Sequence, residues 1–282
     1  MRLLIAIGTT PHWEATLIFG GYIAQRLDPQ PTILTVIEQQ SDRPAANAFL
    51  AQAAETLAPF SQTVHRLVRV GQPVEEIIRE AKDGGYGLVV LGERKRRGLI
   101  SRFQSRSTAV QVVGNAPCSA LIVKGTIRPL RKLLLCEGGD KSNSLVRRLV
   151  DQLSGLVAGK EEITVLHVMS QIGAGPGVRG KQLRASAQEL IEEHSPEGQV
   201  LESDMQVLTE RCTHCRPKVR HGLVVDEILA EARSGDYDLV VIGAHPGEGW
   251  QRFLLSDLAS QIIIRIDRPI LIMQPREPKR AP

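Results

Sequence analysis

Two glycine-bearing loops contain the residue types in this sequence that are best suited to bind an anion. In the first half of the chain, the segment from Gly92 to Ser107 includes Gly98, one lysine and five arginines. In the second half, Gly243 and Gly249 lie in the corresponding loop. Glycines let backbone N–H groups approach a phosphate closely, and cationic side chains add charge. A solvated surface loop can have the same composition, so both interpretations stay open.

A second candidate site is the cysteine pair Cys212 and Cys215, which flanks His214. Thiolates at this spacing can bind zinc or form a reversible disulfide. A zinc site usually needs a second pair of ligands at suitable spacing, and the sequence contains no second CxxC pair. We therefore expect both cysteines to have a structural role and expect no metal.

The sequence lacks the motifs of two common enzyme classes. It has no G-x-S-x-G, which marks a hydrolase nucleophile, and no G-x-x-x-x-G-K-[ST], which marks a P-loop ATPase. Glu137 has no evident partner for acid–base catalysis. His12 and Trp13, with His245 and Trp250 in the other half, lie in loops at strand ends, where ligands often bind. Exposed or packed side chains are the simpler interpretation, so we expect the chain not to be an enzyme.

The elements that must position these residues alternate between buried strands and amphipathic helices. Short apolar runs such as Leu3–Ile7, Leu88–Leu91 and Leu239–Ile242 fit strands that are covered on both faces. Between them, apolar residues recur at helical spacing, as in Ala15, Ile18, Phe19, Tyr22 and Ile23. This alternation predicts an α/β fold with a mostly parallel, doubly wound sheet.

The two halves of the chain are copies of one another. Gly243 follows Gly92 by 151 residues and Phe253 follows Phe103 by 150, so one extra residue lies in the first loop. A period this long indicates two whole domains rather than the short repeats of a solenoid. The expected divisions are a first domain at 1–125, a second at 130–275 and a tail at 276–282.

The second copy is longer than the first at one place. Val36 and Gly71 are 35 residues apart, whereas Val168 and Gly222 are 54 apart, so the second copy contains 19 more residues. The added residues fall within 173–210, which begins with a glycine-rich loop and continues into a helical region over 182–210. Long loops in compact domains are often functional, but a neutral surface insertion is equally compatible with this sequence.

Composition is that of an ordinary globular chain. Of the 282 residues 42% are hydrophobic, and the net charge of +4 comes entirely from residues 1–125, which hold 14 Lys or Arg against 10 Asp or Glu. No apolar run approaches the roughly 20 residues that a bilayer requires. The four cysteines suit a reducing compartment, so we expect a cytoplasmic protein that does not contact a membrane. The basic loop could attract nucleic acid, but we expect no such partner.

Several motifs, each found in one copy or the other, resemble the universal stress protein family. They are a G-x-P before a helix at Gly71–Pro73, an Ala-Pro-Cys turn at Ala116–Cys118 and the Tyr-Asp-Leu-Val-Val strand entry at Tyr237–Val241. The resemblance covers nearly the whole chain, twice. It implies two Rossmann-like domains of the adenine nucleotide α-hydrolase type, each with five mostly parallel strands and helices on both faces. It also implies pairing of the two domains through their last strands, and a homodimer remains open.

Many members of this family bind ATP. They do so with an Asp after the first strand and with a loop that reads G-x-x-G, then nine residues, then G-S/T. The resemblance therefore implies that the residues at these positions indicate whether this chain binds ATP. In the first copy, Gly8 stands at the Asp position and Lys95 at the second loop glycine. Arg106 replaces the last glycine, and only Ser107 keeps its type. Lysine and arginine could hold a phosphate by charge, so ADP or ATP binding in this copy is the alternative hypothesis.

The second copy departs from the same pattern at every position after the first glycine. Glu137 stands for the Asp, Pro246 for the second glycine and Ser256 for the third, while Asp257 takes the hydroxyl position. Proline has no N–H and cannot adopt positive φ, and a carboxylate opposes a phosphate. We expect this site not to bind ATP. The candidate nucleotide-binding residues are Val36, Gly92, Lys95, Gly98, Arg106, Ser107, Glu137, Val168, Gly243 and Gly249.

These observations together predict a non-catalytic cytoplasmic protein of the universal stress type. We expect it to act by association with an unidentified protein or by sensing a small ligand, with no cofactor and with nucleotide sites that have been lost. An ATP- or ADP-binding switch that uses the basic loop is the alternative.

Overall fold

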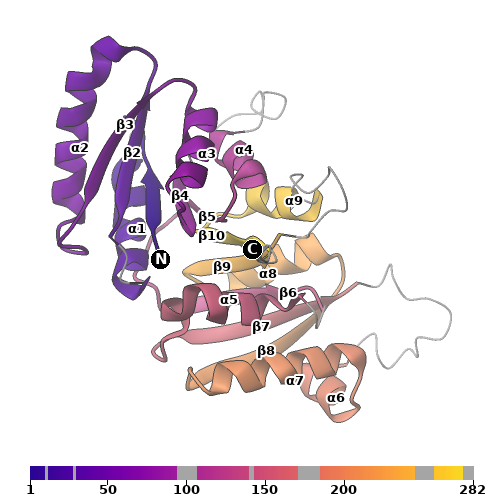
Figure 1. Cartoon of the computed structure of the whole chain (residues 1–282). Helices are drawn as coiled ribbons and strands as arrows, with labels where there is room; N and C mark the ends of the chain where they lie inside the picture. Colours follow the sequence, from indigo (N-terminus) through magenta and orange to yellow (C-terminus); the bar gives the residue numbers. More distant parts are fainter. Residues whose placement is uncertain are drawn as a thin grey trace, which may run out of the picture. The chain divides into compact units, whose positions relative to one another are not determined.

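The computed structural model divides into two compact units (Figure 1). It describes residues 1–9, 12–27, 30–93, 107–139, 143–170, 185–244 and 257–275. Of these, the first unit contains residues 1–129 and 267–272, and the second contains the remainder. Each unit is a parallel sheet with helices packed against it, which confirms the predicted α/β fold in tandem.

The sheet of the first unit begins with the strand order β3-β2-β1-β4-β5, all parallel. Its strands are β1 (Leu3–Ala6), β2 (Thr32–Ile37), β3 (His65–Val70), β4 (Leu88–Gly92) and β5 (Ser119–Val123). Its helices are α1 (Trp13–Leu27), the short η1 (Gln40–Asp42), α2 (Arg43–Leu57), α3 (Pro73–Asp83) and α4 (Thr108–Asn115). Helix α1 packs on α2, and α3 packs on α4. Because the chain reverses direction across the sheet at β1, right-handed crossovers place these two pairs on opposite faces.

The last strand of the chain, β10 (Ile270–Met273), runs antiparallel to β5. Leu271 lies opposite Leu121, and Ile270 lies opposite Ile122. This pairing accounts for the presence of residues 267–272 in the first unit. This antiparallel pair differs from the four parallel pairs that join β3, β2, β1, β4 and β5 in the described part of the unit.

The second unit repeats the arrangement in the strand order β9-β6-β7-β8. Its strands are β6 (Lys132–Glu137), β7 (Glu162–Met169), β8 (His214–His221) and β9 (Leu239–Gly243). Its helices are α5 (Leu145–Leu153), the short η4 (Ser154–Val157), α6 (Ala187–Glu192), α7 (Pro196–Thr209), α8 (Val224–Ser234) and α9 (Asp257–Arg265). The apolar strand residues, such as Leu133, Leu134 and Leu135, are completely buried.

The described part of the helical region predicted over 182–210 contains two helices, α6 and α7. Helix α7 lies between the second and third strands of its unit, as α2 does in the first, so the added residues precede it. Helix α6 ends near His194, which has a positive φ of 53°. Ser195 then caps α7, and its hydroxyl oxygen accepts a hydrogen bond from the Gly198 N–H at 3.0 Å. Pro196 occupies the first turn of α7, where proline is favoured and where its ring would interrupt a longer helix. Helix α7 packs against α5, β7 and β8.

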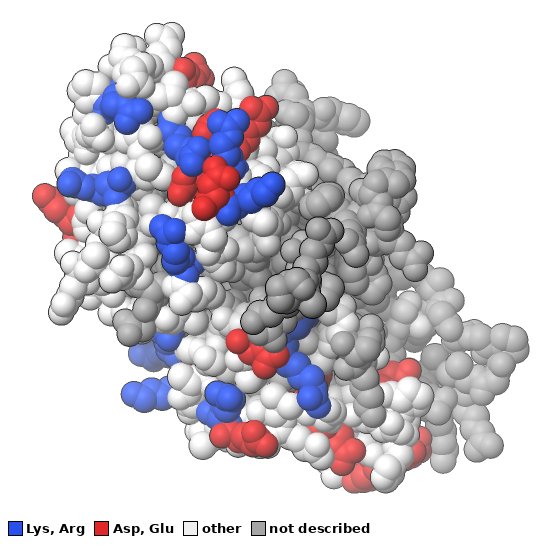
Figure 2. Space-filling model, in the orientation of Figure 1, with Lys and Arg blue, Asp and Glu red and all other residues white. Residues whose placement is uncertain are grey.

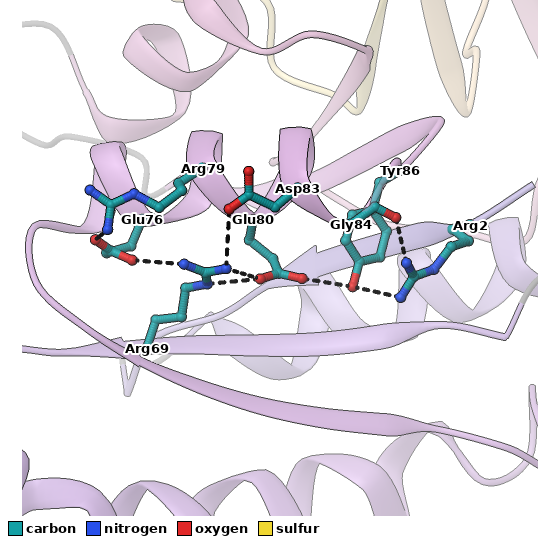
Figure 3. Close-up of polar contacts among 8 residues, drawn as sticks. All are labelled: Arg2, Arg69, Glu76, Arg79, Glu80, Asp83, Gly84 and Tyr86. Carbon is teal, nitrogen blue, oxygen red and sulfur yellow. Dashed lines mark hydrogen bonds and ion pairs between the residues drawn. The ribbon is translucent and has the colours of Figure 1, made fainter.

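A cluster of charged residues joins the third strand of the first unit to the following helix (Figure 3). Arg69 of β3 donates from Nε to Glu80 Oε2 at 2.7 Å and from Nη1 to Glu76 Oε2 at 3.2 Å. The Tyr86 hydroxyl donates to Glu80 Oε1 at 3.1 Å. Arg2 lies with its guanidinium carbon 4.4 Å from the Tyr86 ring centroid, which adds a cation–π contact.

The second unit contains the same cluster at positions 151 residues further along. Arg220 of β8 donates from Nε to Glu227 Oε2 at 2.6 Å and from Nη1 to Glu231 Oε2 at 3.0 Å. The Tyr237 hydroxyl donates to Glu231 Oε1 at 2.8 Å. Lys218 adds an ion pair of 2.7 Å to Glu231. The duplication therefore extends from the sequence pattern to the individual polar contacts that attach a helix to the outer strand.

Charged side chains of both signs are interspersed on the face shown in Figure 2. Within the described part of the chain, this face therefore shows no continuous basic patch. No helix among the described residues combines the length and the apolar content that crossing a bilayer requires.

Candidate functional site

In the first unit, Glu93 connects the end of β4 to the beginning of α4. The Ser107 hydroxyl donates to Glu93 Oε1 at 2.7 Å, and Lys124 Nζ lies 3.0 Å from Glu93 Oε2. Ser107 also caps α4, because its Oγ accepts a hydrogen bond from the Val110 N–H at 3.3 Å. Lys124 is only 8% exposed, so this ion pair lies largely out of solvent.

This arrangement occupies the one hydroxyl that the sequence kept from the phosphate-binding pattern. A phosphate at Ser107 would have to displace the Glu93 carboxylate or lie against its negative charge. The charge of Lys124 is already neutralised by the same carboxylate. The geometry at the end of β4 therefore favours a closed ion-pair cluster over an anion site.

The first glycine of each loop lies against a helix residue of its own unit. A Cβ atom added at Gly92 would collide with Oγ1 of Thr16, which is buried in α1. A Cβ atom added at Gly243 would lie 2.5 Å from Arg148 Nη2 of α5. Thr16 and Arg148 occupy equivalent places, 132 residues apart, as do Val36 and Val168. Close packing of α1 on the strand end thus favours glycine at position 92 whether or not a ligand binds, whereas the flexible end of Arg148 could move away from a Cβ atom at position 243.

In the second unit, Glu137 at the end of β6 accepts three backbone hydrogen bonds. Its Oε1 accepts from the N–H groups of Gly138 at 2.8 Å and Gly139 at 3.3 Å, and its Oε2 accepts from the Leu145 N–H at 2.8 Å. Leu145 is the first residue of α5, where unpaired N–H groups and the helix dipole favour an anion. The protein thus supplies its own carboxylate at the helix start.

A second carboxyl group, that of Asp204 in α7, lies at the same helix start, because Ser144 binds Asp204 while the next residue, Leu145, binds Glu137. The Ser144 hydroxyl donates to Asp204 Oδ1 at 2.7 Å, and Asp204 is only 1% exposed. Asp204 Oδ2 is buried and receives no hydrogen bond from a donor in the described residues. Burial, and then the charge of Glu137, raise the pKa of Asp204 to about 7.

Arg148 is the cation at this strand end in the second unit. Its Nη1 donates to the Met273 carbonyl oxygen at 3.2 Å, and its Nε is buried without a partner among the described residues. Burial lowers the pKa of Arg148, while the charge of Glu137 acts in the opposite direction. Arg148 and Glu137 therefore balance each other in charge within the unit.

The remaining candidate residues fall into two groups. Val36 and Val168 lie half-buried near the carboxyl ends of β2 and β7, in register with Arg69 and Arg220 of the two charged clusters. Lys95, Gly98, Arg106, Gly249, Pro246, Ser256, His245 and Trp250 lie outside the described residues. Asp257 begins α9.

The loop residues of the first unit and the cysteine pair have contacts within the protein. The Trp13 ring packs edge-on against Phe49, with centroids 5.3 Å apart, whereas His12 is exposed. Cys212 Sγ donates to the Glu161 carbonyl oxygen at 3.3 Å, and Cys215 Sγ lies 3.6 Å from the Cys212 carbonyl oxygen. Burial and then the Cys212 thiol raise the pKa of Cys215, which disfavours its reactive thiolate.

The described part of the chain contains no group of three His, Cys, Asp or Glu residues that could hold a metal ion. The carboxyl pair of Glu137 and Asp204 is the feature of this region that the sequence did not indicate. The two residues are 67 positions apart, and Asp204 lies in α7, which is equivalent to α2 of the first copy. Only the docking of α7 against α5 brings them together.

Comparison with known proteins gives one matching family and many similar structures. The sequence profile of the Universal stress protein family matches residues 1–124 and again residues 130–274. A universal stress protein from Archaeoglobus fulgidus DSM 4304 has a similar structure, with a TM-score of 0.68 and 16% sequence identity over 98% of this chain and 97% of that one.

A functionally unknown protein from Pseudomonas aeruginosa PAO1 is similar with a TM-score of 0.65 and 16% identity, over 97% of this chain and 92% of its own. At this level of identity the two structures support the fold alone. The comparison with curated proteins gives no match.

Proposed function

The chain belongs to the universal stress protein family, and from this premise we propose that it is a non-catalytic stress-response protein whose nucleotide sites have been lost. In this proposal it acts by associating with another protein or by sensing a small ligand other than ATP. The proposed location is the cytoplasm. The proposed pairing of the two domains with each other, and a homodimer, are compatible with this role.

The observation that carries the proposal is the engagement of Glu93 with Ser107 and Lys124. The hydroxyl and the buried cation that could meet a phosphate in the first unit both bind the same carboxylate. An incoming triphosphate would have to break this ion pair and then tolerate the Glu93 charge nearby. Both costs oppose nucleotide binding.

The second unit supports the same proposal through different residues. Glu137 satisfies the start of α5 with a carboxylate, and Arg148 covers Gly243. Asp257 replaces the hydroxyl of the family pattern. At Asp257 a carboxylate thus stands where the family pattern has a hydroxyl that favours phosphate.

Isothermal titration of the whole protein with ATP and with ADP tests the proposal. We expect no saturable heat at about 1 mM nucleotide, which corresponds to a binding free energy weaker than about −4 kcal/mol. Glu93→Gln removes the opposing charge and keeps a hydrogen-bonding side chain, so we expect it to gain measurable affinity. Glu75→Gln, an exposed carboxylate on α3, is the matched control and should behave as the wild type. Micromolar affinity in the wild-type protein would contradict the proposal.

An ATP- or ADP-binding switch on the first unit is the second candidate function. It is favoured by the one lysine and five arginines between Glu93 and Ser107, a segment that contains no acidic residue. If the protein is such a switch, we expect the wild type to bind ATP or ADP and Lys95→Glu to abolish this binding. Unchanged affinity in Lys95→Glu would count against this candidate.

A further inference from the structure

Asp204 is a buried carboxyl group at the interface between α7 and the rest of the second unit. Helix α7 contributes it, β6 contributes the neighbouring Glu137, and the residue before α5 contributes the Ser144 hydroxyl. Apolar residues of α7 such as Val200, Leu201 and Leu208 are buried as well. The pair thus sits in a packed interface and not on a solvated surface.

The hydrogen bonds around the pair favour Asp204 as the group that carries a proton. Glu137 accepts three backbone N–H bonds with both of its oxygens, which is the arrangement that stabilises an ionised carboxylate. Two ionised carboxylates cannot hydrogen-bond to each other, because each is only an acceptor. Contact between the groups is therefore favourable when Asp204 is protonated and donates to Glu137.

The other charged groups around the pair do not neutralise Asp204. Arg147 of α5 points its Nη2 to Ser203 Oγ at 2.8 Å in an exposed position, so solvent screens its attraction. Arg148 acts on Glu137 and is bound to the Met273 carbonyl oxygen. From β7, the His167 Nδ1 contacts the Glu137 backbone oxygen at 3.1 Å.

We propose that Glu137 and Asp204 form a proton-dependent latch, which fixes α7 and the attached α6 to the second unit while Asp204 is protonated and loosens them once it is ionised. Loss of the proton places two like charges side by side in a buried interface. Movement of α7 relieves this repulsion, because α7 carries Asp204, whereas backbone hydrogen bonds from the residues after β6 and from the start of α5 hold Glu137 in place. This inference does not depend on whether the protein binds nucleotide.

The direction of the pH dependence follows from the raised pKa of Asp204, which is about 7 in the docked state. A detached, solvated Asp has a pKa of about 4, so the docked state binds more protons over the range between the two values. The latch is therefore complete below about pH 4, weakens as the pH rises towards 7 and is fully lost above 7.

Hydrogen exchange of the full chain, read by mass spectrometry on peptides covering 196–209, tests the latch. After correction for intrinsic exchange rates, we expect the exchange rate of α7 to rise at least about tenfold between about pH 5 and pH 8. Asp204→Asn keeps a donor facing Glu137 and cannot ionise, so its α7 should stay protected at both pH values. Glu202→Gln, an exposed change on the same helix, should behave as the wild type, and α2 peptides report on pH effects elsewhere.

Two results would overturn the latch. One is equal corrected protection of α7 at the two pH values in the wild type, and the other is a pH-dependent loss that persists in Asp204→Asn. The carbon-13 chemical shift of the Asp204 carboxyl in the wild-type protein gives a measurement that needs no variant. A midpoint near 7 supports the latch, and a midpoint near the ordinary value of about 4 contradicts it.

Discussion

The Tyr237 hydroxyl donates a hydrogen bond of 2.8 Å to Glu231 Oε1, and both residues lie in the buried part of the second unit. Removal of the hydroxyl leaves Glu231 with one donor fewer in a site that water does not reach. We expect Tyr237→Phe to lower the free energy of unfolding of the second unit by about 1–3 kcal/mol. Urea denaturation followed by circular dichroism measures the change.

Tyr22→Phe is the matched control for this substitution. Tyr22 packs against the rings of Phe19 and Phe60, and these contacts do not use its hydroxyl. We expect a change within about 0.5 kcal/mol. If both variants lost the same free energy of unfolding, the hydrogen bond from Tyr237 to Glu231 would not contribute to stability.

Glu231 should also set the acid stability of the second unit. Burial alone would raise the pKa of Glu231, but hydrogen bonds from Lys218, Tyr237 and Arg220 outweigh it and lower the pKa below the usual 4.5. The folded state therefore releases this proton more readily than the unfolded state. The resulting stabilisation is complete above pH 4.5 and is lost as the pH falls through the lowered value.

We expect Glu231→Gln to be less stable than the wild type at neutral pH, and the difference to shrink as the pH falls below the usual glutamate pKa. Thermal melts over a series of pH values measure this convergence. A constant difference at all pH values would mean that lost packing, and not the charge of Glu231, causes the effect.

The glycine that precedes each charged cluster should resist substitution. Gly222 has a φ of 150°, and a Cβ atom there would lie 2.9 Å from Glu227 Oε1. We expect Gly222→Ala to destabilise the second unit by about 1–3 kcal/mol, because it combines backbone strain with displacement of a carboxylate that binds Arg220. Chemical denaturation provides the measurement.

Gly8→Ala is the corresponding control, since a Cβ atom at Gly8 meets no atom within 4 Å. Its effect should stay within about 0.5 kcal/mol. If Gly222→Ala were equally mild, the positive φ would not be a constraint at that position.

Substitutions at Glu93 and Lys124 should have non-additive effects on the free energy of unfolding. Glu93→Ala leaves Lys124 in a largely buried position without this carboxylate, which we expect to cost about 3–5 kcal/mol. Lys124→Met in the Glu93→Ala background should recover part of that loss, because no charge then remains buried. A double-mutant cycle measures the coupling, and additive effects of the two changes would refute it.

Local sequence patterns were sufficient to predict the strands and the repeat, because these depend on short-range apolar spacing. The offset that relates Gly92 to Gly243 also relates the contacts of Arg69 to those of Arg220, since equivalent residues fold into equivalent elements. The sequence indicated Ser107 as a candidate site residue. It did not indicate that Glu93, which immediately follows Gly92, binds Ser107.

Contacts between distant segments account for what the sequence could not predict. Glu93 meets Lys124 because β4 and β5 are adjacent in the sheet, and Glu137 meets Asp204 because α7 docks on α5. The second contact depends on Asp204 of α7, whose counterpart at the offset that relates Arg69 to Arg220 is Ala53 of α2, so the repeat gave no information about it. A pair of acids far apart in a sequence has no spacing rule that would reveal it.

The position of β10 has a consequence for how the protein is made. Residues 267–272 belong to the first unit, yet the ribosome synthesises them only after the whole of the second copy. Until that point the edge of β5 that β10 later covers is open, and open strand edges promote association between nascent chains. The amino-terminal half of the polypeptide therefore completes its sheet last, although it is translated first.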